Sequence, residues 1–192
     1  MKSLKVVLAE DEPIARRDIK EMLAAGRIIT IGECGNGVDA VALAKRLKPD
    51  LIIMDIKMPV MNGIEAAKIL NEEKVAPVML LTAYSQEHLI DEARKAGVLA
   101  YLVKPVNVKN LIPACHIAVS RYEQFNILAS EVNTLSEALE SRKLIEKAKG
   151  IIQRVYNMDE EAAFKKIRTT SMNQRKTLKE VAEAIIITLG DE

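Results

Sequence analysis

Short apolar runs alternate regularly with helix-period stretches from residue 4 to residue 120 of this 192-residue chain. The apolar runs are Leu4–Ala9, Ile28–Glu33, Leu51–Met54, Val78–Leu81 and Ala100–Val103; the stretches between them are Ile14–Ala24, Val38–Leu47, Gly63–Leu70 and Glu87–Ala96. Strands that are apolar throughout are typical of a parallel sheet covered on both faces by helices. The pattern predicts an α/β, doubly wound, five-stranded parallel sheet of order 2-1-3-4-5, flavodoxin-like, with its site at the carboxyl ends of the strands.

From Asn110 onward the pattern is that of helices alone, with no glycine between Gly97 and Gly150. If the helix begins near Asn110, Pro113 falls in its first turn, where a missing N–H costs little. An apolar stripe with coiled-coil spacing follows and stops before Arg142; its members are Phe125, Leu128, Val132, Leu135 and Leu139. Two interpretations of the stripe stay open: pairing with a second copy of the chain, or burial against the chain's own later helices.

Two further helices are predicted near the carboxyl end. Asp159 is suited to cap a helix over Glu160–Thr170, and we interpret Phe164 on its apolar face as a core residue. Thr177 and Glu180 form a capping-box pattern at the start of the last helix. The chain is therefore expected to comprise a domain at residues 1–120, a coiled-coil linker helix at 121–141 and an all-α three-helix output domain at 142–192.

The net charge of +1 hides an asymmetry along the chain. Residues 142–176 hold ten Lys or Arg against four Asp or Glu, whereas the remainder has 18 basic and 23 acidic residues. This asymmetry indicates that only the basic segment meets a polyanion, with a merely solvated helical surface as the alternative.

Cysteine usage and hydropathy bear on location. Cys34 and Cys115 have no metal-like spacing, which favours a reducing compartment. The longest apolar stretches are far below the ~20 residues that span a bilayer, and the amino terminus has no pattern of a secretion signal. We expect a cytoplasmic protein without membrane contact.

Polar residues stand where the apolar runs stop. Glu10 and Asp11 follow the first run, Asp55 the third, Thr82 the fourth and Lys104 the fifth. Because parallel strands end at one edge of a sheet, these groups should converge. Packed carboxylates repel one another, and a hard cation such as Mg²⁺ relieves the repulsion. One carboxylate can then attack a phosphoryl group, while the ammonium and the hydroxyl hold the transferring oxygens.

Residues 4–120 resemble the receiver domain of two-component response regulators, on the motifs Glu10-Asp11, Met54-Asp55-Ile56-Lys57-Met58-Pro59, Asn62-Gly63, Thr82-Ala83 and Val103-Lys104-Pro105. The resemblance implies that Asp55 accepts a phosphoryl group from a sensor histidine kinase. It implies Mg²⁺ ligands in Glu10, Asp11, Asp55 and the backbone carbonyl of Lys57; Glu10, where the family more often has Asp, would act through a water.

The same resemblance assigns further roles. Thr82 and Lys104 would contact the phosphoryl group, Tyr101 would change rotamer on activation, and the Lys104–Pro105 bond is commonly cis in the family. The chain would not be an enzyme beyond its own phosphorylation and dephosphorylation at Asp55.

Residues 125–190 resemble the ANTAR output domain, most clearly in Arg142-Lys143-Leu144-Ile145-Glu146-Lys147-Ala148-Lys149-Gly150-Ile151-Ile152. Weaker matches are Glu161-Ala162-Ala163-Phe164, Ile167-Arg168, Leu178 and Val181-Ala182. The resemblance implies binding of tandem RNA hairpins that compete with a transcription terminator. With the apolar stripe, it leads us to expect a homodimer on phosphorylation.

The candidate RNA contacts are Lys149, Gly150, Arg154, Arg168, Arg175 and Lys176, although each cation also suits a solvated surface. A glycine inside a helix costs about 1 kcal/mol relative to Ala, so Gly150 indicates close approach of RNA or of a neighbouring helix. Tyr156 suits either base stacking or a partly buried core position.

Two rival outputs remain. A DNA-binding regulator would need a recognition helix after a tight turn, and the connection Thr169–Lys176 looks too long for one. A regulator that acts through protein interaction would use the basic helices to dock an acidic partner.

Overall fold

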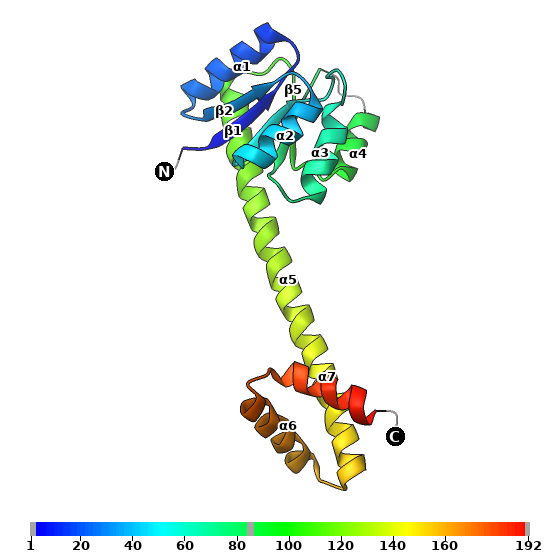
Figure 1. The fold of residues 1–192 in the computed structure, drawn as a ribbon. Helices are drawn as coiled ribbons and strands as arrows, with labels where there is room; N and C mark the ends of the chain where they lie inside the picture. Colours follow the sequence, from blue (N-terminus) through cyan, green and yellow to red (C-terminus); the bar gives the residue numbers. More distant parts are fainter. Residues whose placement is uncertain (1–2, 84–86, 191–192) are drawn as a thin grey trace. The chain divides into compact units, whose positions relative to one another are not determined.

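The computed structural model of the protein describes residues 3–83 and 87–190, with the backbone alone for 87–90. It divides into two compact units, Met1–Asn126 and Ile127–Glu192, whose helices and strands are drawn in Figure 1. Each unit has hydrophobic core residues of its own.

The first unit is built on a parallel sheet. Its strands are β1 (Lys5–Ala9), β2 (Ile29–Cys34), β3 (Leu51–Asp55), β4 (Val78–Thr82) and β5 (Ala100–Val103). They pair in the order β2-β1-β3-β4-β5, and every pairing is parallel. The predicted fold class and strand order are confirmed.

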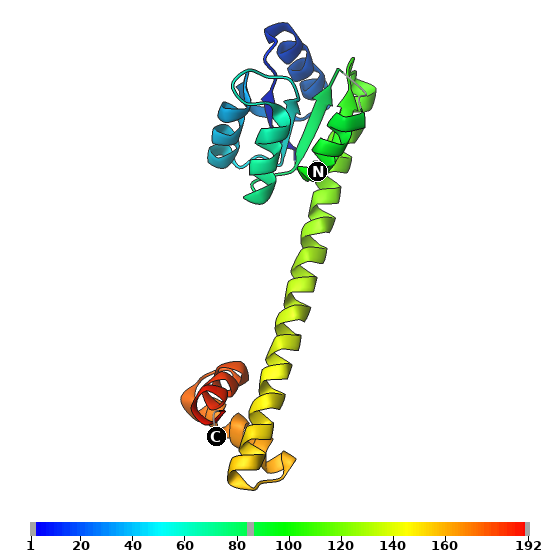
Figure 2. The same ribbon diagram turned by 90° about the vertical axis from the view of Figure 1, so that its right-hand side faces the viewer.

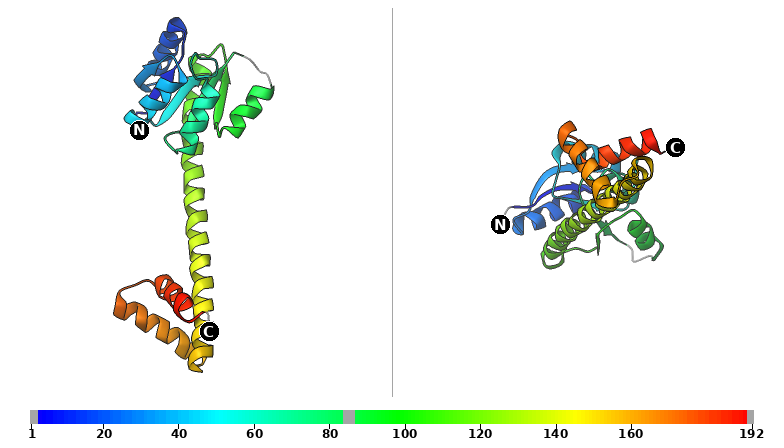
Figure 3. Two further views of the ribbon diagram at one scale, coloured as in Figure 1. Left: turned by 45° about the vertical axis from the view of Figure 1, so that its right-hand side comes forward. Right: turned by 90° about the horizontal axis from the view of Figure 1, so that it is seen from below.

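Helices cover both faces of this sheet because successive strand residues point to opposite sides. Leu51 and Ile53 of β3 pack with α1 (Pro13–Ala25) and the first turns of α5 (Val108–Tyr156). Ile52 and Met54 pack on the other face with α2 (Gly37–Leu47), α3 (Gly63–Glu72) and α4 (Glu87–Lys95). Figure 3 shows these helices beside the sheet. All five β3 residues are buried, which explains why the strand is apolar up to Asp55.

The start of α5 differs from the expectation. The helix begins at Val108 because Asn107 and Asn110 each accept a hydrogen bond from the other's backbone N–H, which forms a cap. Pro113 therefore lies in the second turn instead of the first, and the carbonyl four residues before it lacks the usual helical donor.

The second unit packs α6 (Glu160–Gln174) and α7 (Leu178–Leu189) against the last turns of α5 (Figure 2). Its small core consists of Ala148, Ile152, Ala163, Ile167, Val181 and Ala182. The side chain of Asp159 accepts from Ala162 N, and Thr177 with Glu180 forms a reciprocal capping box. Both predicted caps are confirmed.

Two details of the second unit correct the sequence interpretation. α6 continues to Gln174, so only the three residues Arg175, Lys176 and Thr177 join it to α7. The expected long connection was wrong because residues 171–174 still have helical backbone. Phe164 is 41% exposed, since α6 turns Ala163 and Ile167 into the core and leaves the neighbouring position at its edge. No helix in the described ranges is long and apolar enough to cross a membrane.

Candidate functional site: the carboxyl edge of the sheet

Four polar residues from four strands meet at the carboxyl edge of the sheet. Glu10 follows β1, Asp55 and Thr82 are the last residues of β3 and β4, and Lys104 follows β5. The strand register aligns Asp55 with Leu81 and Thr82 with Val103, so these strands end nearly level. The backbone N–H of Lys104 donates to the carbonyl of Thr82 at 2.7 Å, and the Lys104–Pro105 peptide bond is cis, as is common in the family that the sequence resembles.

The ammonium group of Lys104 contacts two carboxylates. Its Nζ lies 2.7 Å from Oε2 of Glu10 and 3.0 Å from Oδ2 of Asp55. The other oxygen of Asp55, Oδ1, accepts a hydrogen bond of 2.8 Å from the backbone N–H of Ile56. Both oxygens of Asp55 are thus oriented by donors from different parts of the chain.

Burial sets the electrostatics of this cluster. Glu10 is 1% exposed, and its burial raises the pKa of the carboxyl group above the ordinary value despite the hydrogen bond from Lys104. For Lys104, burial works against the charged form, but the hydrogen bonds that its ammonium donates to Glu10 and Asp55 outweigh this effect and raise the pKa. The lysine therefore remains an ammonium group throughout the neutral pH range.

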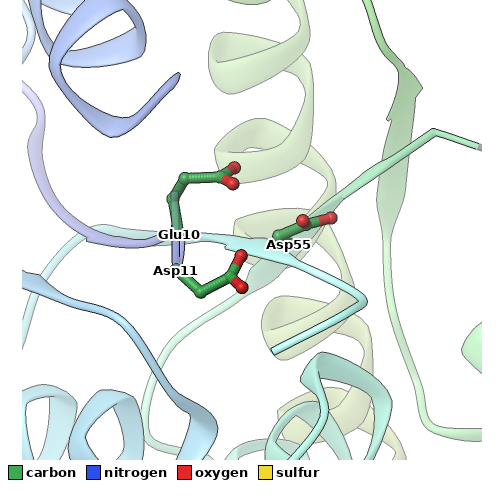
Figure 4. Close-up of side chains that lie close together, drawn as sticks. All are labelled: Glu10, Asp11 and Asp55. Atoms are coloured by element: carbon green, nitrogen blue, oxygen red, sulfur yellow. The ribbon is translucent and has the colours of Figure 1, made fainter. Parts of the chain in front are cut away.

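Three carboxylates gather at this edge (Figure 4). Glu10, Asp11 and Asp55 each place an oxygen so that all three oxygens lie within 4.8 Å of one another. Asp11 is exposed, whereas Glu10 and Asp55 are buried, so the cluster is open to solvent on the side of Asp11. One ammonium group cannot balance three carboxylates, and a hard divalent cation would.

A hollow of about 650 Å³ adjoins the cluster and includes Asp11, Lys57, Asn62 and Glu92 in its lining. α3 begins beside it, where Asn62 and Glu65 form a capping box. A side chain at Gly63 would place a Cβ 2.1 Å from the carbonyl oxygen of Asp55. The Asn62-Gly63 pair therefore lets α3 start directly against the end of β3.

Sequence reasoning missed two contributors to this region. Nη1 of Arg16 donates to the backbone carbonyl of Glu10 at 2.6 Å, and Glu92 from α4 lines the hollow. Arg16 lies in the first turn after Glu12-Pro13, but no motif marks it, and Glu92 is one of many acidic residues on a helix. Of the other predicted residues, Thr82 is 3% exposed, while Tyr101 on β5 is 45% exposed.

The predicted RNA contacts lie in the second unit in two different settings. Arg154, Arg168, Arg175 and Lys176 are exposed. Lys149 is 9% exposed, and its Nζ lies 2.6 Å from Glu146 and 2.7 Å from Glu160 of α6. The hydrogen bonds that Lys149 donates to these two carboxylates raise its pKa.

Gly150 faces open space on α5. It is exposed, and no atom of the described chain, apart from its own helix backbone and sequence neighbours, lies within 4 Å of a Cβ placed there. Of the two explanations for this glycine, packing against a neighbouring helix of the same chain is excluded.

The apolar stripe on α5 is uncovered. Its exposed fractions are 60% for Phe125, 60% for Leu128, 64% for Val132, 70% for Leu135 and 55% for Leu139. Of the two open interpretations, burial against the chain's own later helices is therefore not what this structure contains.

The fold and the strand-edge cluster define a class: a receiver domain joined to a helical output unit. Residues 6–116 match the model of the response regulator receiver domain, and residues 133–186 match the model of the ANTAR domain. The chain belongs to the response regulator family, with a receiver domain followed by an ANTAR domain.

A particular relative covers nearly the whole chain. The transcriptional regulatory protein PdtaR of Mycobacterium tuberculosis is 49% identical over 186 residues, which make up 97% of this chain and 91% of PdtaR.

Solved structures agree for the first unit. The signal receiver domain of NarL from Mycobacterium tuberculosis superposes with a TM-score of 0.60 at 24% identity, covering 62% of this chain and 98% of that one; this shows the fold. The receiver domain of the sensor histidine kinase PA1611 from Pseudomonas aeruginosa, with a magnesium ion coordinated in its active-site cleft, matches with a TM-score of 0.56 at 27% identity, covering 62% and 99%.

Proposed function

We propose that this response regulator is controlled by phosphotransfer from a sensor histidine kinase to Asp55, which promotes dimerisation and the binding of tandem RNA hairpins and so causes transcription antitermination. The main support for this proposal is that Lys104 contacts both Glu10 and Asp55, beside Asp11. The same chain also has an ANTAR domain. In this proposal residues 1–120 receive the signal, 121–141 pair in the dimer and 142–192 bind RNA.

Asp55 is the nucleophile in the proposed reaction. One of its oxygens attacks the phosphorus atom, the P–N bond to the kinase's histidine breaks, and the electron pair stays on the imidazole nitrogen, which takes up a proton. The N–H of Ile56 and the ammonium of Lys104 orient the carboxylate beforehand. Lys104 then neutralises charge on the transferred oxygens, and the buried Thr82 contributes a hydroxyl donor. Tyr101 is the proposed switch residue, and its exposed ring leaves room for a second rotamer.

The carboxylate cluster fits Mg²⁺. It offers hard oxygen donors within 4.8 Å of one another, with an open side at Asp11 where an ion that keeps several waters has room. Asp11, Asp55 and the backbone carbonyl of Lys57 would hold the ion, and Glu10, already bonded to Lys104, suits a contact through water. When bound, the ion would neutralise charge on the phosphoryl oxygens.

One face of α5 supports the RNA-binding part of the proposal. Lys143, Lys147, Gly150 and Arg154 recur at helical spacing and are all exposed. Within the described residues, no carboxylate pairs with these three cations. The space above Gly150 lets a phosphate backbone come close to the helix. Lys149 is better suited to hold α5 against α6, through Glu160, than to contact RNA.

One observation favours a DNA-binding output instead. The three-residue turn between α6 and α7 has the length found in helix-turn-helix motifs. However, α7 in the recognition position carries only one basic residue, Lys179, against Glu180 and Glu183, and its exposed side includes Ala184 and Ile187. Such a helix has few side chains that could bind phosphates or base edges, so RNA remains the proposed ligand.

The phosphorylation step is tested with a small phosphodonor and Mg²⁺. The wild type should gain an acid-stable, base-labile label that Asp55→Asn abolishes, and Asp11→Asn should weaken labelling through loss of the metal. Equal labelling of the Asp55→Asn variant would rule out this phosphoacceptor.

The output step is tested by recovering and sequencing the RNA that co-purifies with the phosphorylated protein. A two-hairpin RNA of that sequence should bind more tightly than its single-hairpin half, because the second contact becomes intramolecular, and affinity should fall as salt rises. Arg168→Ala should weaken binding, whereas the matched control Lys95→Ala on α4 should not. Tighter binding to duplex DNA would favour the DNA-binding rival; co-purification of an acidic protein without RNA would favour protein interaction.

A further inference from the structure

The second unit contains a pocket of about 260 Å³ between its three helices. Tyr156 at the end of α5, Thr170 and Gln174 of α6, and Lys176 of the turn line it together with an apolar wall from α7 that includes Val181 and Ile185. Pockets that bury drug-sized ligands measure about 300–1,000 Å³. This pocket is therefore sized for one small, compact group.

The lining combines an aromatic ring, apolar side chains and hydrogen-bonding groups. The amide of Gln174 can both donate and accept, and no hydrogen bond engages it among the described residues. The hydroxyl of Thr170 donates to the carbonyl of Lys166 at 2.9 Å, which leaves its oxygen able to accept. An apolar wall with a donor and an acceptor at its rim suits a planar heterocycle with a polar edge.

Positively charged side chains lie near Tyr156, the aromatic residue of the pocket. Nζ of Lys166 lies 3.5 Å from the centroid of the Tyr156 ring and covers one ring face. Tyr156 is 45% exposed and lines the pocket, so part of its ring surface is open to a stacking partner. Lys176 lines the pocket and Arg175 precedes it in the turn. A heterocycle that enters with an attached phosphate would thus meet positive charge.

We infer that this pocket binds a single unstacked nucleobase from the loop of an RNA hairpin. Tyr156 stacks on the base, Gln174 reads its hydrogen-bonding edge, and Lys176 pairs with the adjoining phosphate. The inference rests on the proposed RNA-binding function, and it assigns the recognition of the RNA sequence to one site, this pocket. Loops are where such reading is possible, because their bases can be splayed out and stacked on aromatic side chains.

The test uses AMP, GMP, CMP and UMP as probes of the full chain, without Mg²⁺, and follows the methyl NMR signals of Val181, Ile185 and Leu189. At least one nucleotide should shift these signals saturably, while ribose 5-phosphate, which lacks a base, should not. Tyr156→Ala should weaken the binding about fivefold or more, the range expected for one lost base stack. Tyr156→Phe, which keeps the ring, and Val155→Ala, a neighbour outside the pocket lining, should bind as the wild type does.

Three results would overturn the assignment: no shift with any nucleotide, equal shifts with ribose 5-phosphate, or undiminished binding by Tyr156→Ala. Should that variant fail to fold, Gln174→Ala decides instead, since it should reduce discrimination among the four nucleotides, and unchanged discrimination would refute the reading role.

A parallel selection separates this inference from the proposed function. The wild type is used to select hairpins from an RNA pool with randomised loops. Enrichment without nucleotide-induced shifts refutes only the pocket. If no hairpin is enriched, RNA binding itself fails, whatever the nucleotides do.

Discussion

Lys104 contacts Glu10 and Asp55, residues that are 94 and 49 positions away in the chain. Glu10 is almost fully buried, and its raised pKa records the cost of keeping an ionised carboxylate there. A buried carboxylate that loses its partner is far costlier than a surface one. At the residue scale, the stability of the carboxyl edge and the phosphorylation that we propose there therefore depend on the same ammonium group.

Replacing this ammonium should expose that dependence. Without Mg²⁺, Lys104→Met should lower the free energy of opening of the β1 and β3 amides by about 1–3 kcal/mol, because two carboxylates lose their donor. Mg²⁺ should restore part of the loss by neutralising the cluster. Amide hydrogen exchange of the full chain, with and without Mg²⁺, measures both effects.

Lys20→Met is the matched control for that measurement, since it breaks the surface ion pair with Glu33. It should cost at most about 1 kcal/mol and show no added response to Mg²⁺. If Lys104→Met lowers the free energy of opening no more than Lys20→Met does, and if Mg²⁺ has no effect on it, the stability of this edge does not depend on Lys104.

At the scale of the element, the start of α7 and the exposed face of α5 influence the stability of the second unit. The capping box of Thr177 and Glu180 starts α7 after a turn of three residues, and Gly150 interrupts the exposed face of α5. The first feature adds stability and the second subtracts it. Substitutions that remove the capping box should therefore lower the stability of the folded chain, whereas a substitution that removes Gly150 should raise it.

The capping box should make the stability of α7 depend on pH. The backbone N–H and the hydroxyl of Thr177 donate to the Glu180 carboxylate and lower its pKa below the ordinary value of 4.5. A carboxylate with a lowered pKa in the folded chain stabilises it above pH 4.5, and this contribution is lost as the pH falls through the folded pKa. Amide exchange in α7 should be faster in Glu180→Gln than in the wild type at pH 7, and the difference should vanish in acid.

Glu183→Gln, which removes a carboxylate of α7 outside the capping box, is the control for that comparison. If Glu180→Gln and the wild type differ equally at pH 7 and in acid, the pH dependence has another source.

Gly150→Ala should stabilise the protein and weaken RNA binding at the same time. The new methyl group meets no atom within 4 Å, and alanine is the better helix former by about 1 kcal/mol. If RNA approaches the backbone here, the methyl group should reduce affinity severalfold. Thermal unfolding and filter binding, run on the same preparation, measure the two changes; a stabilised variant with undiminished RNA affinity would show that RNA does not use this space.

At the scale of the whole molecule, the apolar stripe on α5 stands out because the described part of the chain leaves it exposed. Each of its large apolar side chains would gain about 1.5–3 kcal/mol on full burial, and the stripe is short. Association itself costs about 4–15 kcal/mol or more and offsets much of this gain, so that a bias of a few kcal/mol from the receiver domain can shift the population of the dimer.

Phosphorylation should therefore shift the protein from monomer to dimer. Light scattering should show the mass doubling in the presence of phosphodonor and Mg²⁺, and Leu128→Lys/Leu135→Lys should prevent the doubling. The control Ser130→Lys/Asn133→Lys adds the same charge to α5 on the side away from the stripe and should leave the doubling intact. A mass that does not change on phosphorylation would refute gating by dimerisation.

Much of the molecule was determined by local sequence patterns. Apolar runs such as Leu51–Met54 can be satisfied only by strands buried on both faces, and parallel strands must end at one edge, so Glu10, Asp55, Thr82 and Lys104 were bound to converge. The caps at Asp159 and Thr177 were predictable too, because a cap involves residues only three positions apart.

Only the tertiary structure decided which residues on a given helix are covered and where some helices end. The contact of Lys149 with Glu160 needs α6 folded back on α5, and the exposure of Phe164 depends on how α6 is rotated against its neighbours. The extension of α6 to Gln174 shortened a connection whose residues look like a loop, because helix propensity is only a weak guide to where a helix ends. Local periodicity determines what kind of element forms; the burial of each side chain is a property of the partners that the fold brings to it.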